Sequence, residues 1–189
     1  AGDPDAPGET MAEVAKAVQQ GQSEKAVELL TALLKKDDKQ STAYYVRGRE
    51  HFRLGRIKES LADFDRHVAL SPELEPRQWE RGITMYYAKE FARGAKQFEL
   101  YQTFDNRDVE NSVWRFLCMA RSEGVAKARE VMLPIKDDPR VPIDDRVRYY
   151  GAISAAFASV GVQGCAWGYA SGFRLRDGDG WLPGIASAI

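Results

Sequence analysis

The residues most able to act as catalysts or metal ligands are few and scattered in this sequence. His51 and His67 are the only histidines, and neither stands near other metal-ligating residues at a metal-binding spacing. A Ser-His-Asp mechanism would need a strand-turn-helix nucleophile elbow, and no such pattern is present. We therefore expect structural roles for both histidines and predict neither an enzyme nor a metal site.

An acidic string near the C-terminus, Asp177-Gly178-Asp179-Gly180, has a partial likeness to a calcium loop. With Asp177 at loop position 1, Trp181 falls at position 5 and Ala188 at position 12, where a bidentate Glu is needed. Aligning Gly180 with position 6 instead places Leu175 at position 1. Neither register supplies the ligands, so we expect a turn and no bound cation.

Cys118 and Cys165 are the only cysteines and lie in regions of different character. They form no CxxC motif and no disulfide framework. We expect unremarkable thiols, with a single disulfide between them as the alternative. No phosphate-binding loop is present, and no cofactor is expected.

Composition and charge narrow the function classes further. The 27 Lys and Arg residues nearly equal the 28 Asp and Glu residues, so no strong positive field favours nucleic acid. The charge-free stretch 149–173 is interrupted by Gly, Ser and Gln163, and is not a clear membrane span. Residues 1–8 are rich in Pro, Gly and Asp and are expected to form a flexible lead-in.

An internal repeat carries most of the information. Gly82 follows Gly48 at the same interval at which Phe98 follows Phe64. That interval matches the period of the tetratricopeptide-repeat (TPR) helix-turn-helix unit, which is about 34 residues. In a repeat running over 41–74, every signature position holds a suitable residue. Small residues let paired helices approach, large ones fill the space between them, and glycine and proline mark the turn and the stop. These residues are Tyr44, Gly48, Gly55, Ser60, Phe64 and Pro72.

The repeat extends to either side. Residues 75–108 keep Gly82, Gly94 and Phe98, with a turn at 88–90, and residues 7–40 have Gly21 at the turn. Residues 109–142 form a degenerate unit with a turn near Gly124 and stops at Pro134 and Pro139. We predict an all-α TPR solenoid of about four repeats over 9–142. A capping helix over 143–160 and an irregular Gly-rich tail over 161–189, with disorder as an alternative, would follow.

A binding surface is predicted on the first helices of the repeats. In stacked TPR units these helices line the concave face, and residues spaced at i, i+3, i+7 and i+10 look into it. Aromatic and Arg side chains gather at those positions, and such residues dominate binding hot spots. Packing between helices remains the alternative for each aromatic ring, and a solvated surface role for each arginine. The predicted residues are Tyr45, Arg49, Phe52, Arg53, Trp79, Ile83, Tyr86, Tyr87 and Trp114.

Three strings within 41–133 resemble exported bacterial TPR proteins related to the outer-membrane lipoprotein NlpI. They are Tyr45-x-Arg47-Gly48, then Arg81-Gly82-Ile83-Thr84-Met85-Tyr86-Tyr87, then Asp108-x-Glu110-Asn111-x-x-Trp114-x-Phe116-Leu117. The resemblance implies an envelope adaptor without catalytic residues that docks peptidases or peptidoglycan hydrolases. It favours a periplasmic or exported location, with the cytoplasm as the alternative. No lipid-bearing cysteine stands near the N-terminus, so a lipid anchor is not expected.

The chaperone-binding carboxylate clamp of other TPR proteins can be tested by position. Its Lys, Asn and Arg positions are occupied here by Met11, Ala15, Val46, Pro76 and Glu80. Capture of chaperone C-terminal tails is therefore not expected. The sequence predicts a non-enzymatic scaffold that binds a protein or peptide, and the alternative is a TPR regulatory segment of a larger enzyme or signalling protein.

Overall fold

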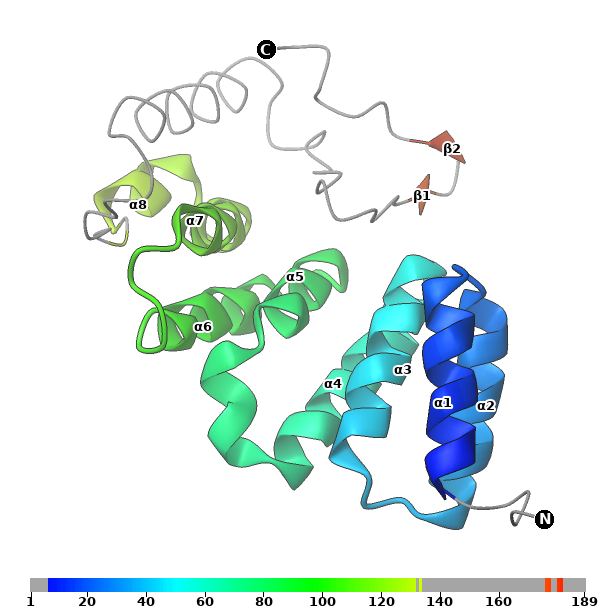
Figure 1. The fold of residues 1–189 in the computed structure, drawn as a ribbon. Coiled ribbons are helices and arrows are strands. Elements are labelled where there is room, and N and C mark those ends of the chain that lie inside the picture. The colour runs from blue at the N-terminus through cyan, green and yellow to red at the C-terminus, as the bar shows by residue number, and fades with distance from the viewer. Residues whose placement is uncertain (1–6, 132, 134–175, 178–179, 182–189) are drawn as a thin grey trace, which may run out of the picture. The chain divides into compact units, whose positions relative to one another are not determined.

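The computed structural model describes residues 7–131, 133, 176–177 and 180–181, and these are overwhelmingly helical (Figure 1). The chain divides into two compact halves, residues 1–90 and 91–189, which are described separately below as the N-terminal half and the C-terminal half. Several predictions lie outside the described residues. They concern the stops at Pro134 and Pro139, the capping helix at 143–160, Cys165 and most of the tail at 161–189.

The N-terminal half consists of five α-helices and one 3₁₀ helix. The α-helices are α1 (Pro7–Gln19), α2 (Ser23–Lys36), α3 (Ser41–Arg53), α4 (Ile57–Leu70) and α5 (Trp79–Tyr87), and the 3₁₀ helix η1 (Pro72–Arg77) precedes α5. Helix α1 begins inside the segment 1–8, where the sequence analysis expects a flexible lead-in. A proline suits a first helical position because its fixed φ is already helical and its missing amide hydrogen is not needed there.

The helices are joined by turns that require a left-handed backbone. Gly21 has φ of 69° between α1 and α2, and Gly55 has φ of 73° between α3 and α4. After α5 the same conformation is adopted by Lys89, with φ of 63°. Glycine adopts this region without steric cost, whereas a residue with a Cβ does not. The three turns lie where the sequence analysis expects them, within the repeats beginning at residues 7, 41 and 75.

Close packing of α3 on α4 follows from one glycine. A Cβ placed on Gly48 would lie 3.3 Å from both the Cβ of Asp63 and the carbonyl oxygen of Ser60, and 3.4 Å from the ring of Phe64. Ser60 is fully buried, and Phe64 is 1% exposed. The small residues therefore allow the approach, and the aromatic ring fills the space between the helices, which confirms the mechanical reasons given for these positions.

The start of α5 differs from expectation. The repeat frame predicts a helix from about residue 75, but η1 occupies Pro72–Arg77 and α5 begins only at Trp79. Pro72 and Pro76 each lack an amide hydrogen, and a proline also disfavours the α conformation in the residue before it. The short 3₁₀ segment accommodates both prolines, and α5 is left with nine residues.

A hydrophobic cluster joins the first three helices. Val14 from α1, three leucines from α2 and Ala43 from α3 are buried together, with Met11 and Val46 partly buried against them. Each fully buried aliphatic side chain of this kind contributes about 1.5–3 kcal/mol relative to an exposed one. The cluster therefore fixes α1 and α3 on a common core with α2. The three leucines are Leu30, Leu33 and Leu34.

The C-terminal half contains α6 (Phe91–Tyr101), α7 (Val109–Glu123) and α8 (Val125–Glu130). Phe98, Leu117 and Ala128 are fully buried. Gly124, with φ of 93°, makes the turn before α8. That helix ends at Glu130, before the stop expected at Pro134.

Two further features complete this half. The carboxylate of Asp108 caps α7 by accepting hydrogen bonds from the backbone amides of Glu110 and Asn111, at 3.0 and 3.3 Å. This cap satisfies amides that the helix itself leaves without partners. In the tail, β1 (Arg176–Asp177) pairs antiparallel with β2 (Gly180–Trp181). The tail is therefore not irregular throughout, and its short ladder flanks the turn expected around residues 178–179.

Candidate functional site

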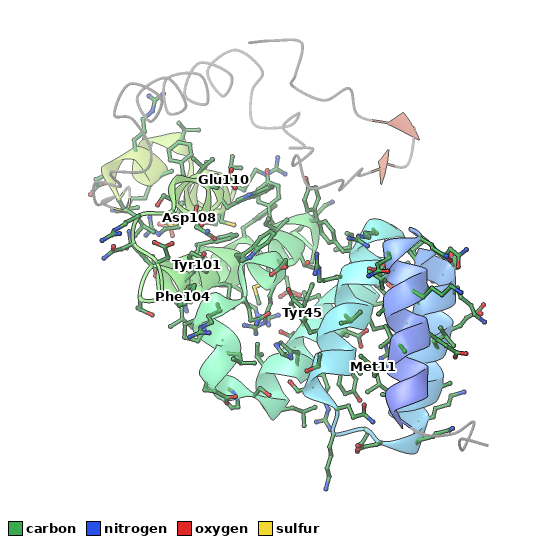
Figure 2. All side chains as sticks on the ribbon, in the orientation of Figure 1. Met11, Tyr45, Tyr101, Phe104, Asp108 and Glu110 are labelled. Atoms are coloured by element: carbon green, nitrogen blue, oxygen red, sulfur yellow. The ribbon has the colours of Figure 1, made fainter. Side chains whose placement is uncertain are left out.

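Helices α3 and α5 contact one another at two points along their length. The hydroxyl of Tyr45, which is labelled in Figure 2, donates a 2.8 Å hydrogen bond to Oε1 of Glu80. The rings of Phe52 and Tyr87 meet edge to face, with 5.7 Å between their centroids. Both are first helices of predicted repeats. The side chains that the sequence analysis placed on one face are therefore brought together, and we call α1, α3 and α5 with these side chains the first-helix face.

Arg49 is a partly exposed cation of the first-helix face. Its guanidinium lies over the ring of Tyr45, with 5.7 Å between its central carbon and the ring centroid, and its Nε is 3.9 Å from Oε1 of Glu80. The Nε is buried and has no acceptor within hydrogen-bonding distance. The side chain as a whole is 36% exposed, against 10% for Glu80. The cation is thus partly exposed at the surface, while its Nε is buried without an acceptor.

Burial controls the protonation of the two groups next to Arg49. Loss of water raises the pKa of Glu80, although the hydrogen bond from Tyr45 opposes the shift. Burial and the neighbouring Glu80 carboxylate together raise the pKa of Tyr45. The phenol therefore remains a neutral donor at physiological pH, and this pair orients side chains without acting as an acid-base couple.

Most of the predicted face residues are half-buried, but Phe52 is not. It is 6% exposed and packs against Tyr87, so it contributes to the core between α3 and α5 and offers almost no surface to a partner. The prediction that Phe52 lines the binding surface is corrected accordingly. The half-buried residues are Tyr45, Arg49, Arg53, Trp79, Ile83, Tyr86 and Tyr87.

Arg53 and Trp114 differ in their surroundings from the other predicted residues. Arg53 donates a 2.8 Å hydrogen bond to Oε1 of Glu50, whose other oxygen accepts a 2.6 Å bond from Ser23. Glu50 is 2% exposed, so part of the charge of Arg53 serves to balance a buried carboxylate. Trp114 is half-buried on α7 and belongs to the C-terminal half, where it is described apart from the first-helix face.

A periodic set of arginines was missed by the sequence analysis. Arg47, Arg81 and Arg115 are spaced by one repeat period, and each reaches an acceptor 16 residues back on the preceding second helix. The acceptors, Thr31, Asp65 and Glu99, recur with the same period and lie 3.1, 2.8 and 3.0 Å from their arginine nitrogens. We call the three arginines the arginine ladder. Their spacing was visible in the sequence, and only the identity of the acceptors required the structure.

The histidines occupy packing positions, as expected. His67 is 4% exposed, and its Nδ1 lies 2.7 Å from the Ser41 hydroxyl and 3.0 Å from the Ser41 carbonyl oxygen. His51 lies 3.9 Å from the carboxylate of Asp63. Burial lowers the pKa of both imidazoles, and the nearby Asp63 carboxylate opposes the shift at His51. Both rings join α3 to α4.

The described residues give no support to other chemistry. Burial raises the pKa of Cys118 to about 12, so its thiol stays protonated and inert near neutral pH. Within the described ranges, no group of three or more His, Cys, Asp or Glu side chains is arranged to hold a metal ion. Over the same part of the chain, no helix has the length and apolarity needed to cross a membrane.

No protein-family model matches the sequence. Among solved structures, "MamA RS-1 ArsTM double mutant" is similar with a TM-score of 0.65 and 16% identity, covering 82% of this chain and 86% of that one. "Crystal structure of MamA" is similar with a TM-score of 0.61 and 16% identity, covering 68% of this chain and 75% of that one. MamA is a TPR-containing protein. The similarity and the helix pairs establish an all-α, TPR-like helical-repeat fold.

Proposed function

We propose that this protein is a non-enzymatic scaffold that binds a partner protein or peptide through the first-helix face. The observation that carries the proposal is the arrangement around Arg49, where a partly exposed guanidinium lies over Tyr45 with its Nε lacking an acceptor. Hydrogen bonds to charged groups contribute about 1.5–3 kcal/mol. A partner that offers an acceptor to the exposed part of the Arg49 side chain would gain an interaction of this kind.

The chemistry of the surrounding residues supports binding over catalysis. Tyr45 holds Glu80 by a hydrogen bond, and Trp79 and Ile83 lie half-buried on the same helix as Glu80. Aromatic residues and arginine bury large areas at little entropic cost, which is why they dominate interface energetics. The TPR-like fold is a second support, because stacked repeats present extended surfaces for partners.

The test is affinity capture with the full chain and a matched pair of double variants. Arg49→Ala with Trp79→Ala removes two side chains from the first-helix face, whereas Lys58→Ala with Arg66→Ala removes two exposed residues from α4. We expect the first variant to lose the partners identified with the wild-type chain and the second to keep them. Equal helical circular-dichroism signals establish that both remain folded. Retention of every partner by the first variant would exclude this face as the binding site.

The finer proposal concerns location and partner class. We propose an envelope adaptor for peptidases or peptidoglycan hydrolases on the resemblance of the three sequence strings to NlpI-like proteins. The MamA structures, at 16% identity, bear on the fold and not on this point. Purified candidate hydrolases can be tested directly for binding to the wild-type chain and to the Arg49→Ala, Trp79→Ala variant. The alternative, a regulatory segment of a larger enzyme, predicts an enzymatic domain encoded in the same reading frame.

A further inference from the structure

We infer that Arg49 anchors an acidic side chain of the bound partner, flanked by an apolar residue that packs on Ile83. This inference rests on the proposed binding role of the first-helix face and names the partner's chemistry. Three observations carry it. They are the position of the Arg49 guanidinium over Tyr45, the difference in exposure between Arg49 and its nearest acid, and the residues at equivalent positions of the neighbouring repeats.

The first observation is the state of the guanidinium. Arg49 has five donor hydrogens in a planar fork, a shape that matches a carboxylate. Stacking over Tyr45 fixes the plane of the fork, because the ring is itself held by the hydrogen bond from its hydroxyl to Glu80. Glu80 does not satisfy Nε, since 3.9 Å is beyond hydrogen-bonding distance. The guanidinium is therefore held over Tyr45 without a hydrogen bond to Glu80, and the exposed part of the side chain is open to an acceptor that comes from outside.

The second observation is the balance of charge at the surface. Arg49 is 36% exposed, whereas Glu80, the acid nearest to it, is 10% exposed. Arg53, one turn further along α3, is hydrogen-bonded to the buried Glu50. An approaching partner therefore meets the cation of Arg49 before it meets either carboxylate. The charge complement of that surface is an acid.

The third observation comes from the repeat register. Ala15 of α1, Arg49 of α3 and Ile83 of α5 occupy the same position in successive repeats, each one repeat period after the last. Ala15 is exposed and Ile83 is half-buried, so both neighbours of the cation are apolar. Helices α3 and α5 contact one another through the side chains of Tyr45 and Glu80 and of Phe52 and Tyr87. A peptide that crosses the face from Arg49 to α5 would therefore place an apolar side chain on Ile83.

The occupant we infer is an acidic side chain within a partner, rather than a free C-terminal carboxylate. Ala15 and Ile83 lie on both sides of Arg49 along the direction of crossing, so the chain is expected to continue past the anchor in both directions. A C-terminal carboxylate would end at Arg49 and leave one of these positions unused. Binding that requires a free C-terminus would overturn this inference.

The experiment selects peptides that bind the full chain from a random library. Both ends of each peptide are fused to the protein that displays it. We expect the selected peptides to be enriched in Asp or Glu, with an apolar residue at a constant spacing from the acid. A synthetic peptide from the selection, with both ends blocked, is then compared with its Glu→Gln or Asp→Asn form by fluorescence anisotropy. Loss of one charge-assisted hydrogen bond corresponds to at least about tenfold weaker binding.

Arg66 provides a matched control. Its guanidinium also stacks over a tyrosine of α3, Tyr44 at 5.9 Å, and also lies beside an acid, Asp38 at 3.7 Å. We expect Arg49→Ala to remove the preference for the acidic peptide, Arg49→Lys to retain part of it, and Arg66→Ala to leave it unchanged. Circular dichroism verifies that each variant is folded.

The outcomes separate this inference from the proposed function. Selected peptides without acidic enrichment, or an acidic preference that survives Arg49→Ala, would overturn the inference. So would a failure to enrich any peptide. The scaffold function is decided separately by the affinity capture, which depends on the first-helix face but not on the charge of the partner.

Discussion

Replacing Arg47 with methionine would test how strongly its buried ion pair with Asp63 holds α3 on α4 within one repeat. Two nitrogens of this guanidinium donate 2.7 Å hydrogen bonds to the two carboxylate oxygens of Asp63, and a third donates to Thr31 at 3.1 Å. The side chains of Arg47 and Asp63 are 17% and 7% exposed. The hydrogen bonds to Asp63 raise the pKa of Arg47 above its ordinary value, so the guanidinium stays charged.

The expected loss follows from the burial of the pair. Removing one partner of a buried ion pair costs about 3–5 kcal/mol, because the remaining charge has no compensation. His51, 3.9 Å from Asp63, offers a partial substitute, so we expect Arg47→Met to lower the free energy of unfolding by about 3 kcal/mol. Adding Asp63→Leu removes the stranded charge. The double variant should therefore recover about 2 kcal/mol.

Urea denaturation followed by far-ultraviolet circular dichroism and by tryptophan fluorescence measures these changes. Coincidence of the two curves establishes that a single transition is being compared. The control is Arg66→Met, whose side chain is 44% exposed and whose partner Asp38 is 68% exposed, and we expect a change within about 0.5 kcal/mol. The reasoning is refuted if Arg47→Met is no more damaging than this control, or if the effects of Arg47→Met and Asp63→Leu simply add.

Three further predictions address α3, α4 and α5. Gly48→Val should lower the free energy of unfolding by about 1–3 kcal/mol, because even its Cβ would meet backbone 3.3 Å away; an unchanged urea midpoint would contradict this. Burial lowers the pKa of His67, so the unfolded chain gains a proton before the folded chain does as the pH falls below about 6.5. The free energy of unfolding should therefore be lower at pH 5.5 than at pH 7.5, and the difference should be smaller in His67→Gln. Urea titrations at the two pH values measure this. Burial raises the pKa of Glu80, so Glu80→Gln should be at least as stable as wild type at neutral pH. Any advantage should disappear in acid as Glu80 itself becomes protonated, and an advantage that grows as pH falls would refute this.

The repeat period determined most of what could be read from the sequence about the fold. Turn glycines such as Gly55, and close-contact positions such as Gly48, have requirements that few other residues satisfy, so their spacing carries structural information. The 3₁₀ segment before α5 also had a local cause in Pro72 and Pro76. It was missed because the repeat frame was extended through residues 75–78 without weighing the second proline.

The candidate site was harder to predict because a helical face has no sharp edge. Successive residues turn by about 100° around a helix, so a residue near the border can point to a partner or to the neighbouring helix. Phe52 was assigned to the surface by its spacing from Arg49, but it packs against Tyr87 of α5. That outcome depends on where α5 lies, which involves long-range packing that the periodicity of α3 does not contain.

The arginine ladder also changes how the NlpI-like strings should be interpreted. Two of them contain an Arg-Gly pair, Arg47-Gly48 and Arg81-Gly82, at the same repeat position. At the first pair, the glycine lets α3 approach α4 closely, and the preceding arginine binds Asp63 on that helix and Thr31 on the helix before. This part of the resemblance is thus explained by the packing of one repeat on the next, which any protein with the same stacking could share. Evidence for a particular partner must therefore come from residues that stacking does not require, and Arg49, partly exposed over Tyr45, is the clearest of these.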